Sequence, residues 1–437
     1  MEQGASLGLV LSMQRSQTIW ILKSRRANIM VSMCALRDIH LPLFLLGFSW
    51  TLVQFPLQIA AVGFGQPFEL TTVASNLATS DQFRDPFGIP TGPTAHVAPV
   101  YAVILAGAIK LLGEPVNVTV AMIILNAVLF GLAASLLPAL SRCVYGQDAP
   151  GLVGGVLLAA SGWMMPQWET ALSALLFLTA ALALMRNGPV RAGLWSGICL
   201  LANPACLLAL TVVALCRSWG SSLASGILRG RRFALPVAGL GLAICAPWIL
   251  RNWIELGSPF FIRDNLGLEL YVSNQDRASA EFVTNWPLWH LHPNQNREEA
   301  KLVAAMGEGP YNQMRFRSAS EWIRTHPKEF ARLSAARAWY YWFPSSREGW
   351  PAYLYWIIGV LSIWGLWTSR KNGWALSLAL SAVVYSLTFT VISTHLRYHY
   401  PSLWISALIA GYGVIEIIKR ARAFAAQPAQ GPGVTTS

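Results

Sequence analysis

Charged residues are scarce in this sequence. Only 12% of its 437 residues are Asp, Glu, Lys or Arg, whereas 54% are hydrophobic. Soluble domains carry about 25% charged residues, so this composition excludes an ordinary soluble protein and indicates an integral membrane protein. The net charge of +12 does not indicate nucleic-acid binding, because the basic residues stand in short runs between apolar segments. Such runs are typical of the cytoplasmic ends of membrane spans.

Several motifs of known chemistry are also missing. The sequence contains no HExxH, GxSxG or P-loop motif and no CxxC pair among its six cysteines. Metal hydrolase, esterase and ATPase functions therefore lack support, and the cysteines are typical of small core side chains. No glycine-rich nucleotide-binding pattern is present. His290, His292 and His326 lack metal-ligand spacing. We expect no cofactor and no metal site, and the sequence leaves a divalent-metal requirement open.

Apolar segments recur along the chain and predict about ten transmembrane helices. The predicted spans are residues 41–62, 118–140, 151–165, 171–185, 192–201, 205–216, 233–253, 352–367, 374–392 and 403–418. In this arrangement every basic cluster faces the cytoplasm, as the positive-inside rule requires. The apolar run at 97–112 would move Arg142 and the Arg186 cluster outside if it crossed, so we predict that it lies in the outer interface. The short arms around Asn203–Pro204 predict a tilted or broken hairpin.

These segments predict an all-α polytopic membrane protein with interfacial helices and large outer loops. The predicted parts are a basic cytoplasmic tail (1–40), a catalytic transmembrane module with an outer loop at 64–101 (41–254), a periplasmic loop region with a juxtamembrane helix at 321–343 (255–350), the last transmembrane helices (351–420) and a disordered tail (421–437). The tail prediction rests on its Pro, Gly and Ala content.

The outer loop at 64–101 is the most informative stretch. It is rich in Gly and Pro, and it is far longer than a connection between two helices needs to be, which favours a functional loop. Glu69 lies near the start of this loop, close to the outer membrane interface. There a carboxylate can reach the head group of a substrate whose lipid lies in the bilayer, and it could act as a general base. Glu169, at the outer junction of two spans, is predicted on the same side. A lone loop acid is usually only solvated, so the two acids together are the stronger signal.

A second group of candidates is basic and aromatic. The last outer loop reads STHLRYHYP, and the planar guanidinium of its Arg397 suits phosphate oxygens. The alternative for this loop is an interfacial anchor, and the alternative for His96 is a hydrogen-bonded structural histidine. The candidates for binding substrate or phosphate are Arg397, Tyr398, His399, Arg251, Arg263 and His96.

Taken in order, these features resemble the GT-C membrane glycosyltransferases. The resemblance is to the bacterial branch similar to protein O-mannosyltransferases and the lipid A aminoarabinose transferase, and it covers roughly residues 41–418. It rests on Glu69 in the first outer loop, the passage PFGIPTGPTAHVAPVY, Glu169 at a span junction, PWILRNW, THPKEF and the closing RYHYP.

The resemblance implies a GT-C-like bundle that moves a sugar, with inversion, from a polyprenyl-phosphate donor to a glycan, lipid or protein acceptor. It places the reaction on the periplasmic face of the bacterial inner membrane. In this family the first-loop acid is the proposed base, which implies Glu69 as base, Glu169 as a second active-site acid and Arg397 as a phosphate ligand. The chain departs from the family in having Glu69 where Asp is usual and Asn203 where Lys or Arg is frequent.

Two other functions stay open at this point. A polytopic transporter or lipid flippase would favour ionisable residues at mid-membrane depth and discontinuous helices in matched halves. Here the acids stand at the outer ends of spans, and the Asn203–Pro204 break is the one feature in favour of transport. The other alternative is a catalytically silent relative that keeps the fold for binding.

Overall fold

The computed structural model describes residues 39–54, 56, 68–162, 168–216 and 223–426. In this part of the chain the structure consists of helices joined by loops, together with two isolated β-bridges that pair Arg84 with Pro93 and Glu281 with Thr394. The predicted all-α class is confirmed. Most of the predicted N-terminal tail and residues 427–437 of the predicted C-terminal tail lie outside the described residues.

Among the described residues, five helices are long and apolar enough to cross a membrane. They are α6 (Pro115–Tyr145), α11 (Leu223–Leu256), α17 (Pro351–Thr368), α18 (Gly373–Val391) and α19 (Leu396–Ala425). The shorter apolar helices are α2 (Leu41–Val53), α5 (Pro99–Leu112), α7 (Ala149–Ala160), α8 (Thr170–Arg186), α9 (Pro189–Ala202) and α10 (Cys206–Cys216). The chain is thus a multi-pass membrane protein. Each predicted span overlaps one of these helices, and α5 overlaps the predicted interfacial run. Residues 55 and 57–62 of the first predicted span and 163–165 of the third lie outside the described residues, and the division into ten spans stays a prediction.

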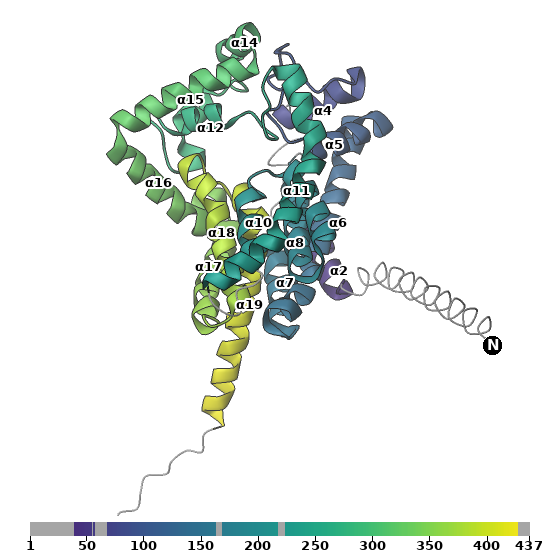
Figure 1. Ribbon diagram of the computed structural model, residues 1–437, viewed down its shortest axis with the longest axis vertical. Coiled ribbons are helices and arrows are strands. Elements are labelled where there is room, and N and C mark those ends of the chain that lie inside the picture. Colours follow the sequence, from purple (N-terminus) through teal and green to yellow (C-terminus); the bar gives the residue numbers. More distant parts are fainter. Residues whose placement is uncertain (1–38, 55, 57–67, 163–167, 217–222, 427–437) are drawn as a thin grey trace, which may run out of the picture.

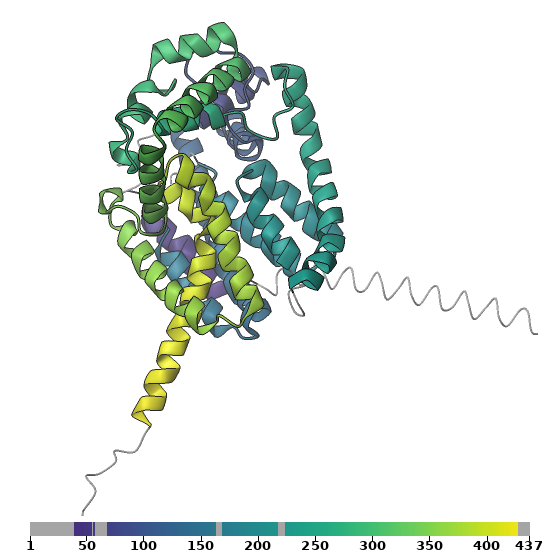
Figure 2. The same ribbon diagram turned by 60° about the vertical axis from the view of Figure 1, so that its left-hand side comes forward.

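Of the remaining helices, α4 and α12 to α15 form a cap, which we call the outer cap after the predicted topology. Their bounds are α4 (Glu69–Ser80), α12 (Leu266–Ser273), α13 (Trp286–Leu291), α14 (Arg297–Met306) and α15 (Glu308–Thr325), with short 3-10 turns at Phe282–Thr284 and Ser346–Glu348. Figure 1 shows the cap at one end of the molecule and the end of α19 projecting from the other. Helix α16 (Pro327–Trp342) connects the cap back to the bundle (Figures 1 and 2).

The structure adds detail to three predicted segments. Within the outer loop a helix begins at Glu69. The single juxtamembrane helix predicted at 321–343 is broken at His326, since Pro327 lacks a backbone N–H and disfavours helical backbone in the residue before it. Helix α19 continues to Ala425, so residues 421–425 are helical and do not belong to a disordered tail.

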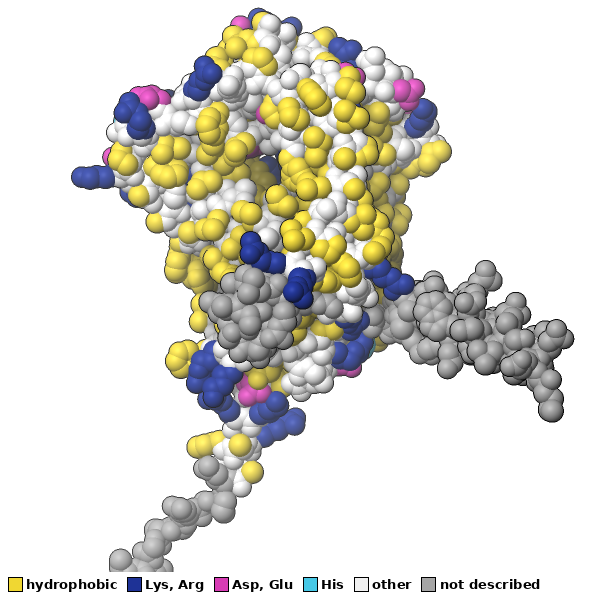
Figure 3. All heavy atoms as spheres, in the orientation of Figure 1, with side chains coloured by type: hydrophobic (Ala, Val, Ile, Leu, Met, Phe, Trp, Pro, Cys, Tyr) yellow, Lys and Arg dark blue, Asp and Glu magenta, His cyan; other side chains and the backbone are white. Residues whose placement is uncertain are grey.

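Side-chain types separate along the long axis of the molecule. Figure 3 shows hydrophobic side chains over the middle of the face in view and Lys and Arg side chains gathered near the end from which α19 projects. Exposed residues at this end include Arg370, Lys371, Lys419, Arg420 and Arg422. This distribution is the one expected when the projecting end of α19 is cytoplasmic and the cap is outside.

Glycines let the bundle pack closely around α19. A Cβ added at Gly411 of α19 would lie 2.1 Å from the carbonyl oxygen of Pro150 in α7, and a Cβ at Gly365 of α17 would lie 2.0 Å from that of Ile409. Helix backbones therefore touch directly on two sides of α19, a form of packing that small residues allow in membranes.

We expect Gly365→Ala to lower the stability of the protein by about 1–3 kcal/mol, because the added methyl group meets fixed backbone. Thermal unfolding in detergent micelles measures the effect. Gly239→Ala in α11 is the matched control, since an added Cβ there meets no described atom within 4 Å. Equal melting temperatures for the two variants would contradict the role of Gly365.

Candidate functional site

A cavity of about 520 Å³ lies between the outer cap and the membrane helices. Its ionisable lining residues are Glu69, His96, Glu169, Arg263, Glu269, His292, His395, Arg397, Tyr385 and Tyr398. Six of the eight predicted site residues are in this set, although they come from widely separated parts of the chain. Much of the remaining lining is aromatic or aliphatic, as in sites that hold a ligand by shape and direct it with a few polar groups.

Glu69 is the first residue of α4, and the local sequence fixes its position. The hydroxyl of Thr71 accepts a hydrogen bond from the backbone N–H of Phe68 at 2.8 Å and donates to the carbonyl of Phe68, also at 2.8 Å. The Phe68 ring packs against Trp168 with 5.7 Å between ring centroids. The helix N-terminus is a favourable place for a carboxylate. Burial nevertheless raises the pKa of Glu69, and its backbone hydrogen bond, Arg397 and Arg263 only partly oppose this.

Glu169 lies next to the first residue of α8 and reaches the cavity from the bundle side. Its Oε1 is 3.9 Å from Nη1 of Arg263, and the Nε of Arg263 donates to the carbonyl oxygen of His96 at 2.9 Å. Arg263 therefore connects the acid of the bundle to the end of the outer loop. Within the described part of the chain, Oε2 of Glu169 is buried and has no hydrogen-bond partner.

Arg397 is held against the cavity wall by aromatic rings. Its guanidinium carbon lies 4.3 Å from the centroid of Trp168, 4.7 Å from Tyr398 and 5.3 Å from Phe282. Nη2 also donates to the hydroxyl of Tyr398 at 2.6 Å. Ring faces attract a cation without using its hydrogen-bond donors, and the buried Nε of Arg397 has no partner among the residues described. The guanidinium is thus fixed in place with donor capacity left for an anion.

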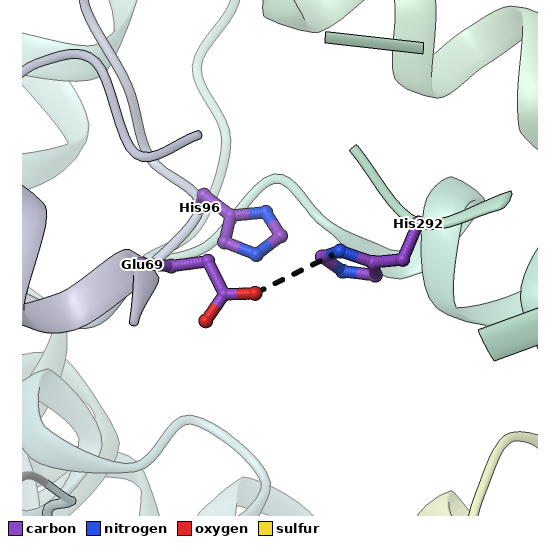
Figure 4. Close-up of side chains that lie close together, drawn as sticks. All are labelled: Glu69, His96 and His292. Carbon is purple, nitrogen blue, oxygen red and sulfur yellow. Dashed lines mark ion pairs between the residues drawn. The ribbon is translucent and has the colours of Figure 1, made fainter. Parts of the chain in front are cut away.

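Figure 4 shows Glu69, His96 and His292 facing one another. Nδ1 of His292 is 3.7 Å from Oε1 of Glu69, and the two imidazole centroids are 5.9 Å apart. The exposed fractions are 9% for Glu69, 3% for His96 and 6% for His292. Burial lowers the pKa of both histidines, so both are neutral at physiological pH. One ligand atom from each residue lies within 4.8 Å of the others, which makes this trio the candidate metal-binding group of the cavity.

Two predicted residues do not line the cavity. Arg251 donates to the backbone carbonyls of Thr94 at 2.6 Å and Phe83 at 2.8 Å, so its position holds the outer loop in place. His399 lies on the other side of the wall, with its ring centroid 4.5 Å from that of Tyr341 and 5.1 Å from that of Tyr355. The pattern RYHY places Arg397 and Tyr398 toward the cavity and His399 away from it, because successive helix residues face different directions.

The broken hairpin contributes to the site as well. Helix α9 ends at Ala202 and α10 begins at Cys206, which confirms the predicted break around Asn203 and Pro204. The side-chain amide of Asn203 donates to the hydroxyl of Tyr385 at 3.1 Å, and both residues line the cavity. The break therefore brings a neutral amide to a place where the resemblance implies a basic residue.

Sequence reasoning missed Glu269, Tyr385 and the role of His292, and it named His395 only as part of the last outer loop. Glu269 is in the first turn of α12 and accepts a hydrogen bond from Asn265 at 3.2 Å. His292 follows α13 and lies next to His96 only because the cap folds over the outer loop. Ligand spacing within one segment is the usual sequence signal, and a group assembled from three segments does not produce it.

A buried acidic cluster fixes the end of the outer loop beneath the cap. Oε1 of Glu308, at the start of α15, accepts from the backbone N–H of Ala95 at 2.6 Å, and Oε2 accepts from the hydroxyl of Thr94. The backbone N–H of Asp264 donates to the carbonyl of Ala95 at 2.9 Å. Burial raises the pKa of Glu308 to about 8 and that of Asp264 to about 7. His96 and Arg263 both adjoin this cluster in sequence.

No family model, curated protein or solved structure matches the chain. The relation to GT-C enzymes therefore stays an expectation from the resemblance, and the site is argued from its own geometry.

We expect the stability of the folded protein to fall as the pH rises from about 4.5 to about 8. In this range folded Glu308, with a pKa of about 8, keeps a proton that an ordinary glutamate with a pKa of 4.5 has released. Glu308→Gln keeps the hydrogen-bonding shape and removes the titration, so its melting temperature in detergent should depend less on pH. Asp264 contributes in the same direction.

The matched control is Glu298→Gln, because Glu298 is an exposed glutamate on the neighbouring helix α14. Its pH profile should match that of the unmodified protein. An unchanged slope in Glu308→Gln would show that Glu308 is not the group that titrates.

Proposed function

We propose that the protein is an inverting glycosyltransferase that moves a sugar from a polyprenyl-phosphate donor to an acceptor on the outer face of the bacterial inner membrane. The observation that carries this proposal is the convergence of acids and guanidiniums on one cavity beside the membrane helices. Glu69 and Glu169 provide carboxylates, and Arg263 and Arg397 provide cations. The finer fold assignment, a GT-C-like bundle of about ten spans, belongs to the same proposal.

In the proposed reaction Glu69 acts as general base. Its carboxylate takes the proton of the acceptor hydroxyl while the acceptor oxygen forms a bond to the anomeric carbon, and the bond from that carbon to the lipid phosphate breaks. A single displacement of this kind inverts the anomeric centre. The raised pKa of Glu69 brings this base closer to neutral pH, where general bases are most effective.

The phosphate that leaves must be stabilised as it gains charge. Arg397 is suited to this task because its planar guanidinium is fixed by Trp168, Tyr398 and Phe282 and carries a donor without a partner in the described structure. Arg263 is paired with Glu169 and contributes a second positive charge. Fixed charges of this kind, directed at developing negative charge, are usually the largest single contribution to catalysis.

The apolar part of the cavity supports a lipid-linked donor. Phe389 and Ile392 near the end of α18, together with Leu266 and Leu288 of the cap, line the same space as the charged residues. A polyprenyl chain would leave the bilayer between the spans with its phosphate near Arg397. A water-soluble nucleotide sugar would not need a binding site at the edge of the membrane helices.

We expect Glu69→Gln to reduce sugar transfer by about 10²–10⁴-fold, because the change removes the base and keeps its shape. The assay supplies polyprenyl-phosphate sugars and cell-envelope extract to purified protein in lipid, and it measures release of lipid phosphate. Glu298→Gln, an exposed glutamate of the cap, should retain full activity. Unchanged release in Glu69→Gln would remove the proposed base.

We expect Arg397→Ala to weaken donor binding by about 10–100-fold, as the loss of a hydrogen bond to a charged group does. The effect on donor affinity should exceed the effect on the rate of transfer at saturation, since the phosphate is bound before the transition state. Binding of a non-transferable donor analogue measures it. Arg324→Ala, at an exposed site in the cap, is the control, and equal affinities for both variants would exclude the phosphate role.

The same preparation tests the flippase alternative. Movement of labelled lipid between leaflets, with no release of lipid phosphate across a broad donor panel, would replace the transferase proposal with transport. Neither release nor movement, with donor still bound, would favour a silent relative.

A further inference from the structure

We propose that Glu69, His96 and His292 form a binding site for a divalent transition-metal cation, with zinc as the ion that best fits the donor set. The three side chains come from the start of α4, the end of the outer loop and the segment after α13, and they meet at the cavity wall (Figure 4). Binding of the ion is independent of the reaction proposed above, and only its role in the cavity rests on that proposal.

The spacing of the donor atoms is close to that of a zinc site. One ligand atom from each residue lies within 4.8 Å of the other two, and Nδ1 of His292 is 3.7 Å from Oε1 of Glu69. In a tetrahedral site with metal–ligand bonds of about 2.0–2.1 Å, ligand atoms are about 3.3 Å apart. Metal binding would therefore draw the three ligand atoms closer together.

The chemical state of the ligands also fits. Metal ions bind neutral imidazole and ionised carboxylate. Nδ1 of His96 is buried and has no hydrogen-bond partner in the described structure. The backbone N–H of Asn294 donates to Nδ1 of His292 at 3.1 Å, so this nitrogen carries a lone pair and not a proton. Coordination would replace that hydrogen bond.

Two histidines and one glutamate are a recognised catalytic zinc set, which leaves a fourth position for water or substrate. Imidazole nitrogen is a poor ligand for Mg²⁺ and Ca²⁺, so the donor set selects against these ions. All three residues line the cavity, and the open position would therefore face the space proposed for the donor phosphate. One carboxylate oxygen of Glu69 suffices for the metal, and the other remains available to accept a proton.

The charges of the cavity allow a cation in spite of two nearby arginines. Glu69, Glu169 and Glu269 oppose Arg263 and Arg397 in the cavity lining, which gives a formal charge of −1 when the three acids are ionised and the histidines neutral. A divalent ion would change this to +1. A phosphodiester carries one negative charge, so the metal-bound cavity would match the proposed donor better than the empty one.

The test is zinc binding to the full-length protein in detergent, with the purification tag removed and bound metal stripped by a chelator. Zinc is then added in slight excess, the protein is desalted, and its metal content is measured by mass spectrometry. We expect about one zinc ion per chain, and we expect His96→Ala and His292→Ala each to lose most of it. Cobalt in place of zinc should give the visible absorption of a tetrahedral site.

His326→Ala is the matched control, because His326 is an exposed histidine of the outer region, and it should retain the metal. Melting temperatures measured in parallel show whether each variant is folded, and Glu69→Gln provides a second variant of nearly unchanged shape. Zinc that is absent from the unmodified protein, or retained by His96→Ala, His292→Ala and Glu69→Gln alike, would overturn the site. Zinc binding without release of lipid phosphate would keep the site and reject the proposed transferase.

Discussion

Burial of charge at the edge of a membrane is the constraint on which this structure depends. Carboxylates and guanidiniums that leave water lose solvation energy, and they persist inside a protein only when partners or dipoles compensate them. The cavity meets this requirement with Glu169 opposite Arg263, with Arg397 enclosed by aromatic rings and with Glu69 at a helix N-terminus. Each compensating group comes from a different segment, so the cap, the outer loop and the bundle must all be in place before the charges are tolerated.

Arg337 shows how the scaffold keeps these segments in register. Its side chain is fully buried in α16, and it donates to the carbonyl oxygen of Ser273, to Oδ1 of Asn274 at 2.9 Å and to the carbonyl of Val391 at 3.3 Å. The carbonyl groups at a helix C-terminus lack partners within the helix. One guanidinium therefore joins the end of α12 in the cap to the end of α18 in the bundle, close to where both elements line the cavity.

The sequence predicted what depends on composition and on single segments. Apolar runs located the apolar helices of the described residues, and the Asn203–Pro204 pair marked a real break. Glu69 was selected for its place just outside the first apolar segment, and Arg397 because its guanidinium suits phosphate oxygens. Most of the differences concern how segments meet. His292 was set aside because its partners lie in other segments, and Arg251 and His399 were grouped with Arg397 although helix geometry and backbone carbonyls direct them elsewhere. Pro327 in the sequence already indicated the break in the predicted juxtamembrane helix, because proline disfavours helical backbone in the residue before it.

Glu69 is the point at which these physical demands meet. Burial raises the pKa of Glu69, which makes its carboxylate a stronger base but leaves a smaller fraction of it ionised at a given pH. Arg397 and Arg263 offset burial only in part. A cation held jointly with His96 and His292 would favour the ionised carboxylate and would add positive charge where a phosphate is expected to leave. The raised pKa of Glu69 and the lowered pKa of both histidines share one main cause, which is burial, and in the proposed site a bound cation would balance the charge of the cavity.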